Sequence, residues 1–190
     1  MGDEVIEVYE VLRERLKSGI RRILEIDRKQ PHFIPVVVMA IGCEAVGQVL
    51  QSVDGQERKP WDVFVEEMIL PHGLTRDMGF DLFQSIRNGL AHSYFAKRIV
   101  LKDERAIVVG VNWGDGVPHL KLRNDPPSIW LSLSQMQTDF EAMLDKYRGV
   151  VQQTSTGGRT MSAWWNEKAA RGTSFESDSQ WARFLEGKTP

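Results

Sequence analysis

Cysteine is nearly absent from this chain: Cys43 is the only one among its 190 residues. A lone cysteine excludes a disulfide framework, and its place in an apolar run predicts a small buried hydrophobe rather than a nucleophile. The first residues, Met1 to Glu4, are acidic and so lack the basic start of a secretory signal peptide. We therefore expect a protein of the reducing cytoplasm.

A strong net charge and long apolar runs are missing as well. Lys and Arg together number 24 against 26 Asp and Glu, which gives a formal net charge of -2. Such a chain does not attract polyanions through its overall field, so nucleic-acid binding would need a local basic patch. We expect no apolar stretch of the roughly 18 residues that span a bilayer, and hence no membrane partner.

The strongest pattern in the sequence is the helical periodicity of its apolar residues. A hydrophobic content of 42% is ordinary for a globular protein, and apolar residues recur at helical spacing in five segments. Ser134, followed three residues later by Gln137, forms a capping-box signature for the last of them. This spacing predicts helices over residues 3–29, about 33–50, 61–70, about 76–96 and from Ser134 to Val151, the last with a core stripe of Met136, Phe140, Met143, Leu144, Tyr147 and Val151.

Short β-type runs separated by turn residues follow residue 97. They predict a small antiparallel β meander at about 98–132, inserted before the last long helix. The fold class is therefore mainly α with this meander. We expect one helical domain over 1–152, and a linker with a short tryptophan-containing amphipathic tail over 153–190.

The first helix is basic in its second half. Between Arg13 and Lys29 there are seven Lys or Arg and three acidic residues. A charge run of this kind on an amphipathic helix is typical of a solvated face, which is how we interpret it.

The stretch from Arg87 to Tyr94 reads Arg-Asn-Gly-Leu-Ala-His-Ser-Tyr. Arginine is a fixed, forked clamp for phosphate, and histidine is the side chain best suited to move protons near neutral pH. Together they suggest work on a phosphodiester or a nucleotide. At about 100° per residue, however, Arg87 and His92 point some 140° apart on one helix, so a complete site would need a second copy across a two-fold axis.

This stretch resembles the Arg-x4-His signature of HEPN domains. It also resembles the longer Arg-x4-His-x-Tyr form of HEPN toxins that are paired with minimal nucleotidyltransferases. The resemblance implies an up-and-down helical bundle, covering about residues 3–97 and the helix after Ser134, that forms homodimers with the motif helices facing each other. It also implies a metal-independent endoribonuclease in a defence or stress role, although other HEPN domains are inactive binding modules.

The resemblance also implies roles for individual residues. Arg87 and His92 would be the catalytic pair, with Asn88 as the supporting polar residue. Tyr94 matches the tyrosine that a nucleotidyltransferase antitoxin modifies, and we expect it to contact RNA together with Lys97 and Arg98. A histidine used as general acid or base contributes typically ~10²–10⁴-fold, and an arginine can stabilise the charged phosphorus in the transition state.

Four further residues are of types that could support the motif or bind a metal. Glu44 is an acid on an apolar helix, where a buried carboxylate needs a partner, and Arg87 is the candidate. His32, His72 and His119 each follow a proline and show no metal-ligand spacing. We interpret these three as loop residues and expect neither a metal site nor a cofactor.

Two other interpretations stay open. The chain could be a non-catalytic protein- or nucleotide-binding module, with Arg87 and Tyr94 as anchors and the tail recruiting a partner. It could also be a toxin that is silenced when a nucleotidyltransferase modifies Tyr94. From the residues alone, Arg87 could equally form a surface ion pair and His92 an interior hydrogen bond.

Overall fold

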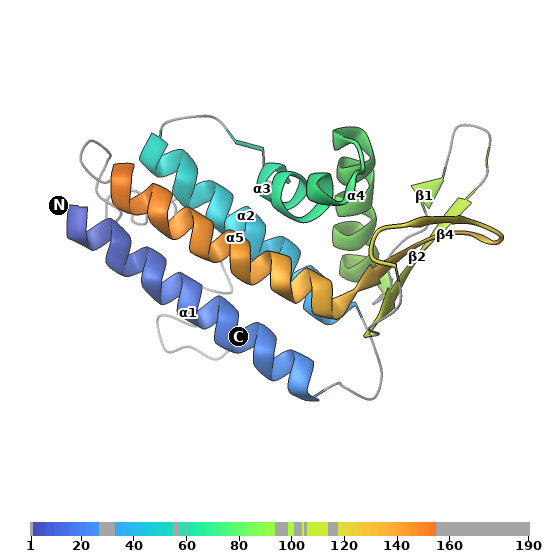
Figure 1. The fold of residues 1–190 in the computed structure, drawn as a ribbon, viewed down its shortest axis with the longest axis horizontal. Coiled ribbons are helices and arrows are strands. Elements are labelled where there is room, and N and C mark those ends of the chain that lie inside the picture. Colours follow the sequence, from blue (N-terminus) through green and yellow to red (C-terminus); the bar gives the residue numbers. More distant parts are fainter. Residues whose placement is uncertain are drawn as a thin grey trace, which may run out of the picture.

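The computed structural model describes residues 2–26, 33–54, 58–59, 61–93, 99–100, 104, 106–113 and 118–154. In this part of the chain three long helices lie side by side, and a small sheet lies at one end of them (Figure 1). Helices α2 and α5 run in the same direction, opposite to α1. Their bounds are α1 Gly2–Ile26, α2 Ile34–Asp54 and α5 Leu133–Thr154. The predicted mainly helical fold with a small sheet is confirmed.

Helix α2 forms the centre of the core. Apolar residues on most of its circumference let it pack against α1 on one side and α5 on another, and Pro35 lies in its first turn, where no backbone donor is lost. By length and composition its window Ile34–Gln51 is apolar enough to cross a membrane, so our expectation that no stretch reaches this length was wrong. However, 56% of that window is buried inside the molecule, as in the core helix of a folded domain.

Charged side chains join α1 to α5 along a line that we call the α1–α5 seam (Glu10, Arg13, Lys17, Arg21, Glu141, Asp145 and Arg148). Asp145 accepts hydrogen bonds from Lys17 at 2.8 Å and from Arg13 at 2.7 Å, and Arg21 donates to Glu141 at 2.6 Å. Lys17 is only 8% exposed. Part of the basic run therefore holds two helices together, which corrects its interpretation as a solvated face.

The segment after α2 contains three short helical turns. They are α3 (Asp62–Phe64), the π-helical turn η1 (Val65–Ile69) and the 3₁₀ turn η2 (Leu70–His72). Gly73 ends them in the left-handed conformation with a φ of 85°, and its N–H donates to the Leu70 carbonyl at 3.0 Å. The expected short helix over 61–70 is present as these three turns, which continue to His72.

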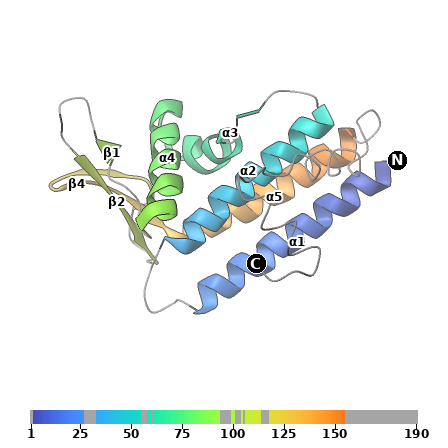
Figure 2. The ribbon, with the colours of Figure 1, turned by 180° about the vertical axis from the view of Figure 1, so that it is seen from behind.

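Helix α4 (Arg76–Ser93) lies steeply inclined between the long helices and the sheet (Figures 1 and 2). Thr75 caps it, because the Met78 N–H donates to the Thr75 hydroxyl at 3.3 Å. Leu82, Phe83 and Ile86 are fully or almost fully buried on its inner face. This face leaves Arg87, the next residue, on the outside.

The sheet has the strand order β1-β2-β4-β3, with bounds β1 Ile99–Val100, β2 Ala106–Asn112, β3 Leu122–Asn124 and β4 Pro127–Ser132. Strands β1–β2 and β3–β4 pair antiparallel, whereas β2 and β4 are parallel, so the expected antiparallel meander is wrong. After β2 the chain reverses, so β3 runs in the opposite direction to β2. Strand β4 then runs in the same direction as β2 and lies between β2 and β3. In this register Val109 lies beside Ile129 and Val111 beside Leu131, and all four are buried.

Strand β4 leads directly into α5. The Gln135 N–H donates to the Ser132 hydroxyl at 3.4 Å, so Ser132 caps α5 and the cap lies two residues earlier than expected. The capping box assigned to Ser134 and Gln137 is therefore wrong, and Gln137 donates to Glu141 instead. The core stripe of α5 is confirmed, because all six of its predicted residues are buried. The expected tail lies, from residue 155 on, outside the described residues.

Candidate functional site

Arg87 is the motif residue whose side chain the structure describes. It projects from α4 with 51% of its side chain exposed, and its Nη2 lies 3.6 Å from Oε1 of Glu44 on α2. Glu44 is only 16% exposed and follows the fully buried Cys43. At 3.6 Å the contact is an ion pair rather than a hydrogen bond. The expected pairing of Glu44 with Arg87 is therefore present.

This geometry leaves the guanidinium available to an anion. A guanidinium carries five N–H donors in a planar fork, so one loose contact with a carboxylate leaves donors for a phosphate. The more N-terminal outer face of α4 carries the exposed acids Asp77 and Asp81, which would repel a phosphate backbone. An anion would therefore bind at the C-terminal end of α4, around Arg87.

The other motif residues are described in part or not at all. The backbone of Asn88 and His92 lies within α4, which continues to Ser93, but their side chains lie outside the described residues. Tyr94, Lys97 and Arg98 lie outside them altogether. One continuous helix thus carries Arg87 and His92, as the sequence predicts, and the catalytic and RNA-contacting roles stay predictions.

No protein-family model, curated protein or solved structure matches this chain. The resemblance to HEPN domains therefore depends on the residues from Arg87 to Tyr94 and on the helical character of the fold.

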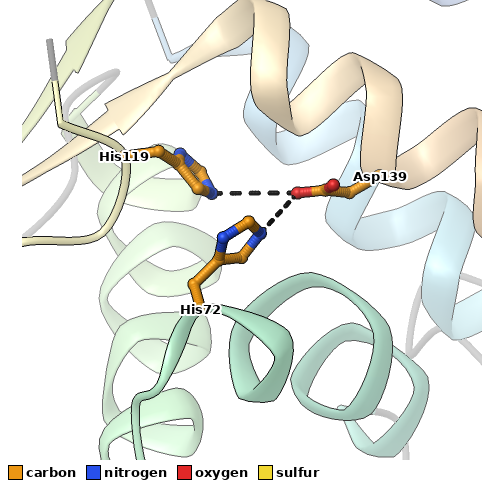
Figure 3. A group of neighbouring side chains, drawn as sticks. All are labelled: His72, His119 and Asp139. Atoms are coloured by element: carbon orange, nitrogen blue, oxygen red, sulfur yellow. Dashed lines mark hydrogen bonds and ion pairs between the residues drawn. The ribbon is translucent and has the colours of Figure 1, made fainter.

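A second group of titratable side chains comes together from other elements of the fold (Figure 3). His72 from η2 and His119 from the turn before β3 both point toward Asp139 of α5. His72 Nε2 lies 2.7 Å from Asp139 Oδ2, and His119 Nε2 lies 3.9 Å from the same oxygen. The two imidazole rings meet edge to face, with centroids 4.4 Å apart. One donor atom from each residue lies within 4.8 Å of the others. We call these three residues the His–His–Asp cluster.

The surrounding backbone and side chains fix the His–His–Asp cluster in place. Gln135, one turn earlier on α5, donates to the other carboxylate oxygen of Asp139 at 2.8 Å. The buried Leu120 holds the turn that carries His119, because its N–H donates to the Trp130 carbonyl at 2.8 Å. These contacts orient Asp139 and His119 toward each other.

His119 has an unusual environment. The Ser132 N–H donates to its Nδ1 at 3.1 Å, so the proton of the neutral ring is on Nε2. That Nε2 is buried and has no hydrogen-bond partner among the described residues. The pKa of His119 is lowered to about 4, and burial of the ring is the largest cause. The neighbouring His72 also lowers this pKa, by more than Asp139 raises it. The ring is therefore neutral at pH 7.

This cluster has no signal in the sequence. Its members are separated by 47 and 20 positions, His72 and His119 follow prolines, and Asp139 is one polar residue among several on an amphipathic helix. Their interpretation as scattered loop residues is corrected for His72 and His119, because the fold brings these two side chains together. His32, the third histidine of that group, lies outside the described residues.

Proposed function

We propose that this chain is a HEPN-like protein that binds RNA and cleaves it by metal-independent endoribonuclease chemistry, in a defence or stress role. The observation that carries the proposal is the exposed guanidinium of Arg87, which pairs with Glu44 and belongs to the helix that also carries His92. The finer features of the proposal are an up-and-down bundle, a homodimer that joins two motif helices, and a cytoplasmic location. The buried, reduced Cys43 agrees with that location.

The proposed mechanism assigns one task to each side chain. His92 removes the proton of the RNA 2′-hydroxyl or delivers a proton to the leaving oxygen, which are the two proton transfers that cleavage without a metal requires. Arg87 binds the non-bridging phosphate oxygens and stabilises the negative charge that grows on them in the transition state. Asn88 is the polar residue that supports Arg87 and His92. The RNA strand is contacted by Tyr94, Lys97 and Arg98.

The helix geometry supports a site that is shared by two copies of the chain. Residues five positions apart on an α-helix point in directions about 140° apart, so Arg87 and His92 of one copy do not face the same phosphate. A two-fold axis beside the C-terminal part of α4 would place Arg87 of one protomer opposite His92 of its partner. The small residues Gly89 and Ala91 allow two such helices to approach closely.

The decisive test compares cleavage of labelled single-stranded RNA by wild type and His92→Ala, in the presence of EDTA. We expect His92→Ala to lose ~10²–10⁴-fold in rate, because the general acid or base is gone. Circular dichroism and sedimentation should show the same fold and oligomeric state. His32→Ala is the matched control and should cleave like wild type. The proposal is wrong if wild type cleaves none of a broad panel of RNAs, or if His92→Ala cleaves as fast as wild type.

A second candidate function is a non-catalytic binding module for a protein or a nucleotide. The ion pair of Arg87 with Glu44 favours it, because the arginine already has an anionic partner. In that case RNA stays intact, while Arg87→Ala weakens the binding of the partner. A nucleotidyltransferase antitoxin would add a mass increase at Tyr94 when the two proteins are co-expressed.

A further inference from the structure

We propose that His72, His119 and Asp139 form a binding site for a divalent transition-metal ion of the Zn²⁺ type. This inference replaces our expectation from the sequence that the chain has no metal site. It is independent of the proposed RNA chemistry, because the His–His–Asp cluster comes from η2, the turn before β3 and α5, whereas Arg87 and Glu44 come from α4 and α2.

The separations in the cluster fit a small cation. Zn²⁺ binds histidine nitrogen and carboxylate oxygen at about 2.0–2.2 Å, which places the ligand atoms of a tetrahedral site roughly 3.4 Å apart. In the structure His72 Nε2 and His119 Nε2 lie 2.7 and 3.9 Å from Asp139 Oδ2, on either side of that value. Small side-chain rotations would therefore bring all three atoms to bonding distance of one ion (Figure 3).

The buried nitrogen of His119 is the independent observation that points to a ligand. The side chain is only 7% exposed, and its Nε2 faces Asp139 without a hydrogen-bond partner among the described residues. Buried polar atoms without a partner are rare in folded proteins, and each one calls for an explanation such as a bound ion or water. A water molecule would satisfy the same nitrogen, so the test must separate water from metal.

Binding a metal at His119 Nε2 has a specific consequence. The ring proton now on Nε2 must move to Nδ1, which accepts the Ser132 N–H at 3.1 Å. The hydrogen bond between Ser132 and His119 must then open. We therefore expect the Ser132 amide resonance to shift when the ion binds, and this shift would not follow from metal bound elsewhere on the surface.

The ligand types select the class of ion. The two imidazoles are borderline ligands, and two imidazoles with one carboxylate suit Zn²⁺ and Co²⁺, whereas Ca²⁺ and Mg²⁺ take oxygen ligands almost entirely. Three protein ligands leave a fourth position for water. Gln135, which holds the second oxygen of Asp139, is the kind of outer partner that orients a metal-binding carboxylate. A bound ion would join three separate segments of the chain and so stabilise the fold.

The test uses the full chain without an affinity tag, stripped with a chelator and titrated with Zn²⁺ and with Co²⁺. We expect one ion per chain, a tetrahedral visible absorption band with Co²⁺, a rise in Tm with Zn²⁺, and no competition from Mg²⁺. Asp139→Asn and His119→Ala should each weaken Zn²⁺ binding by about a hundred-fold or more, since loss of an outer partner alone costs about 10–100-fold. Asp81→Asn, which removes an exposed acid of α4, is the matched control and should bind like wild type.

The proposal is overturned if stripped wild type binds no Zn²⁺ at an equimolar level, or if Asp139→Asn and His119→Ala bind it as tightly as wild type. His72→Gln, a change at a more exposed ligand, serves if His119→Ala fails to fold. Failure of the metal-site proposal is distinct from failure of the RNA proposal, because RNA cleavage is assayed in EDTA and depends on His92.

Discussion

Arg87 would supply the charge for the proposed anion binding at α4, and Glu44 is the carboxylate that pairs with it. The pair is half exposed on the arginine side, so its net contribution to the free energy of unfolding is small, about 0–1 kcal/mol. Its importance is geometric. A mostly buried carboxylate on α2 lies 3.6 Å from the guanidinium, and its attraction favours positions of the Arg87 side chain beside Glu44.

Glu44→Gln tests Glu44 as a positioning residue. We expect the variant to lower kcat for RNA cleavage by about ten-fold, since misplaced reacting groups are costly, while KM stays equal or falls because a negative charge near the phosphate is gone. Stability should change by less than about 1 kcal/mol. Glu66→Gln, which alters the exposed pair between Glu66 and Arg76, is the control and should leave both constants unchanged. An unchanged kcat in Glu44→Gln would refute the positioning role.

Helices α1 and α5 depend on the α1–α5 seam for their alignment. The hydrogen bond from Lys17 holds the pKa of Asp145 below its usual value, and the hydrogen bond from Arg13 adds to this effect. Lys17 is itself almost buried, so loss of its partner would leave a charged donor without compensation. The stability of the contact between α1 and α5 therefore depends in part on one carboxylate, that of Asp145.

We expect Asp145→Asn to lower the free energy of unfolding by about 1–2 kcal/mol at pH 7, a value reduced because Asp145 itself is half exposed. A carboxyl group with a depressed pKa in the folded state stabilises the fold above its unfolded pKa and loses this effect as pH falls through the folded value. The difference between wild type and Asp145→Asn should therefore be full at pH 7 and shrink below the usual pKa of 3.8. Urea unfolding at several pH values measures it, with Asp81→Asn as the control. A difference that is constant down to pH 3 would contradict this account.

Helices could be predicted from this sequence because their signals are local. The apolar stripe of α5 and the end of η2 at Gly73 follow from residues a few positions apart, and both agree with the structure. The parallel pairing of β2 with β4 could not be predicted, because it depends on how Val109 and Val111 pack beside Ile129 and Leu131 although β3 lies between them in the chain. Turn residues mark where strands end but do not say which strands pair.

The same difference separates the two candidate sites. The motif from Arg87 to Tyr94 is contiguous, so it was visible in the sequence, and its partner Glu44 followed from the rule that a buried acid needs a counter-charge. The His–His–Asp cluster has no local signal, because two turns and a helix meet only after the chain has folded. The cap of α5 shows that even a local signal can be assigned to the wrong residue, because the hydroxyl of Ser132 caps the helix in place of the expected Ser134.

The proposed active site needs two copies of the chain, and this makes a complementation experiment possible. Arg87→Ala and His92→Ala should each be inactive as homodimers. If each site takes Arg87 from one protomer and His92 from its partner, a heterodimer of the two variants has one site with both residues intact and one with neither.

Random exchange of equal amounts of the two variants makes about half of the dimers mixed, each with one working site of two, so the mixture should recover about one quarter of wild-type RNA cleavage. Sedimentation of wild type should show a dimer, and dilution that dissociates it should reduce cleavage per chain. Mixing either variant with itself is the control and should recover nothing. A site built within one protomer would give no recovery in the mixture. A chain that stays monomeric at every concentration would exclude the shared site, because Arg87 and His92 of one chain point about 140° apart on α4 and cannot form it alone.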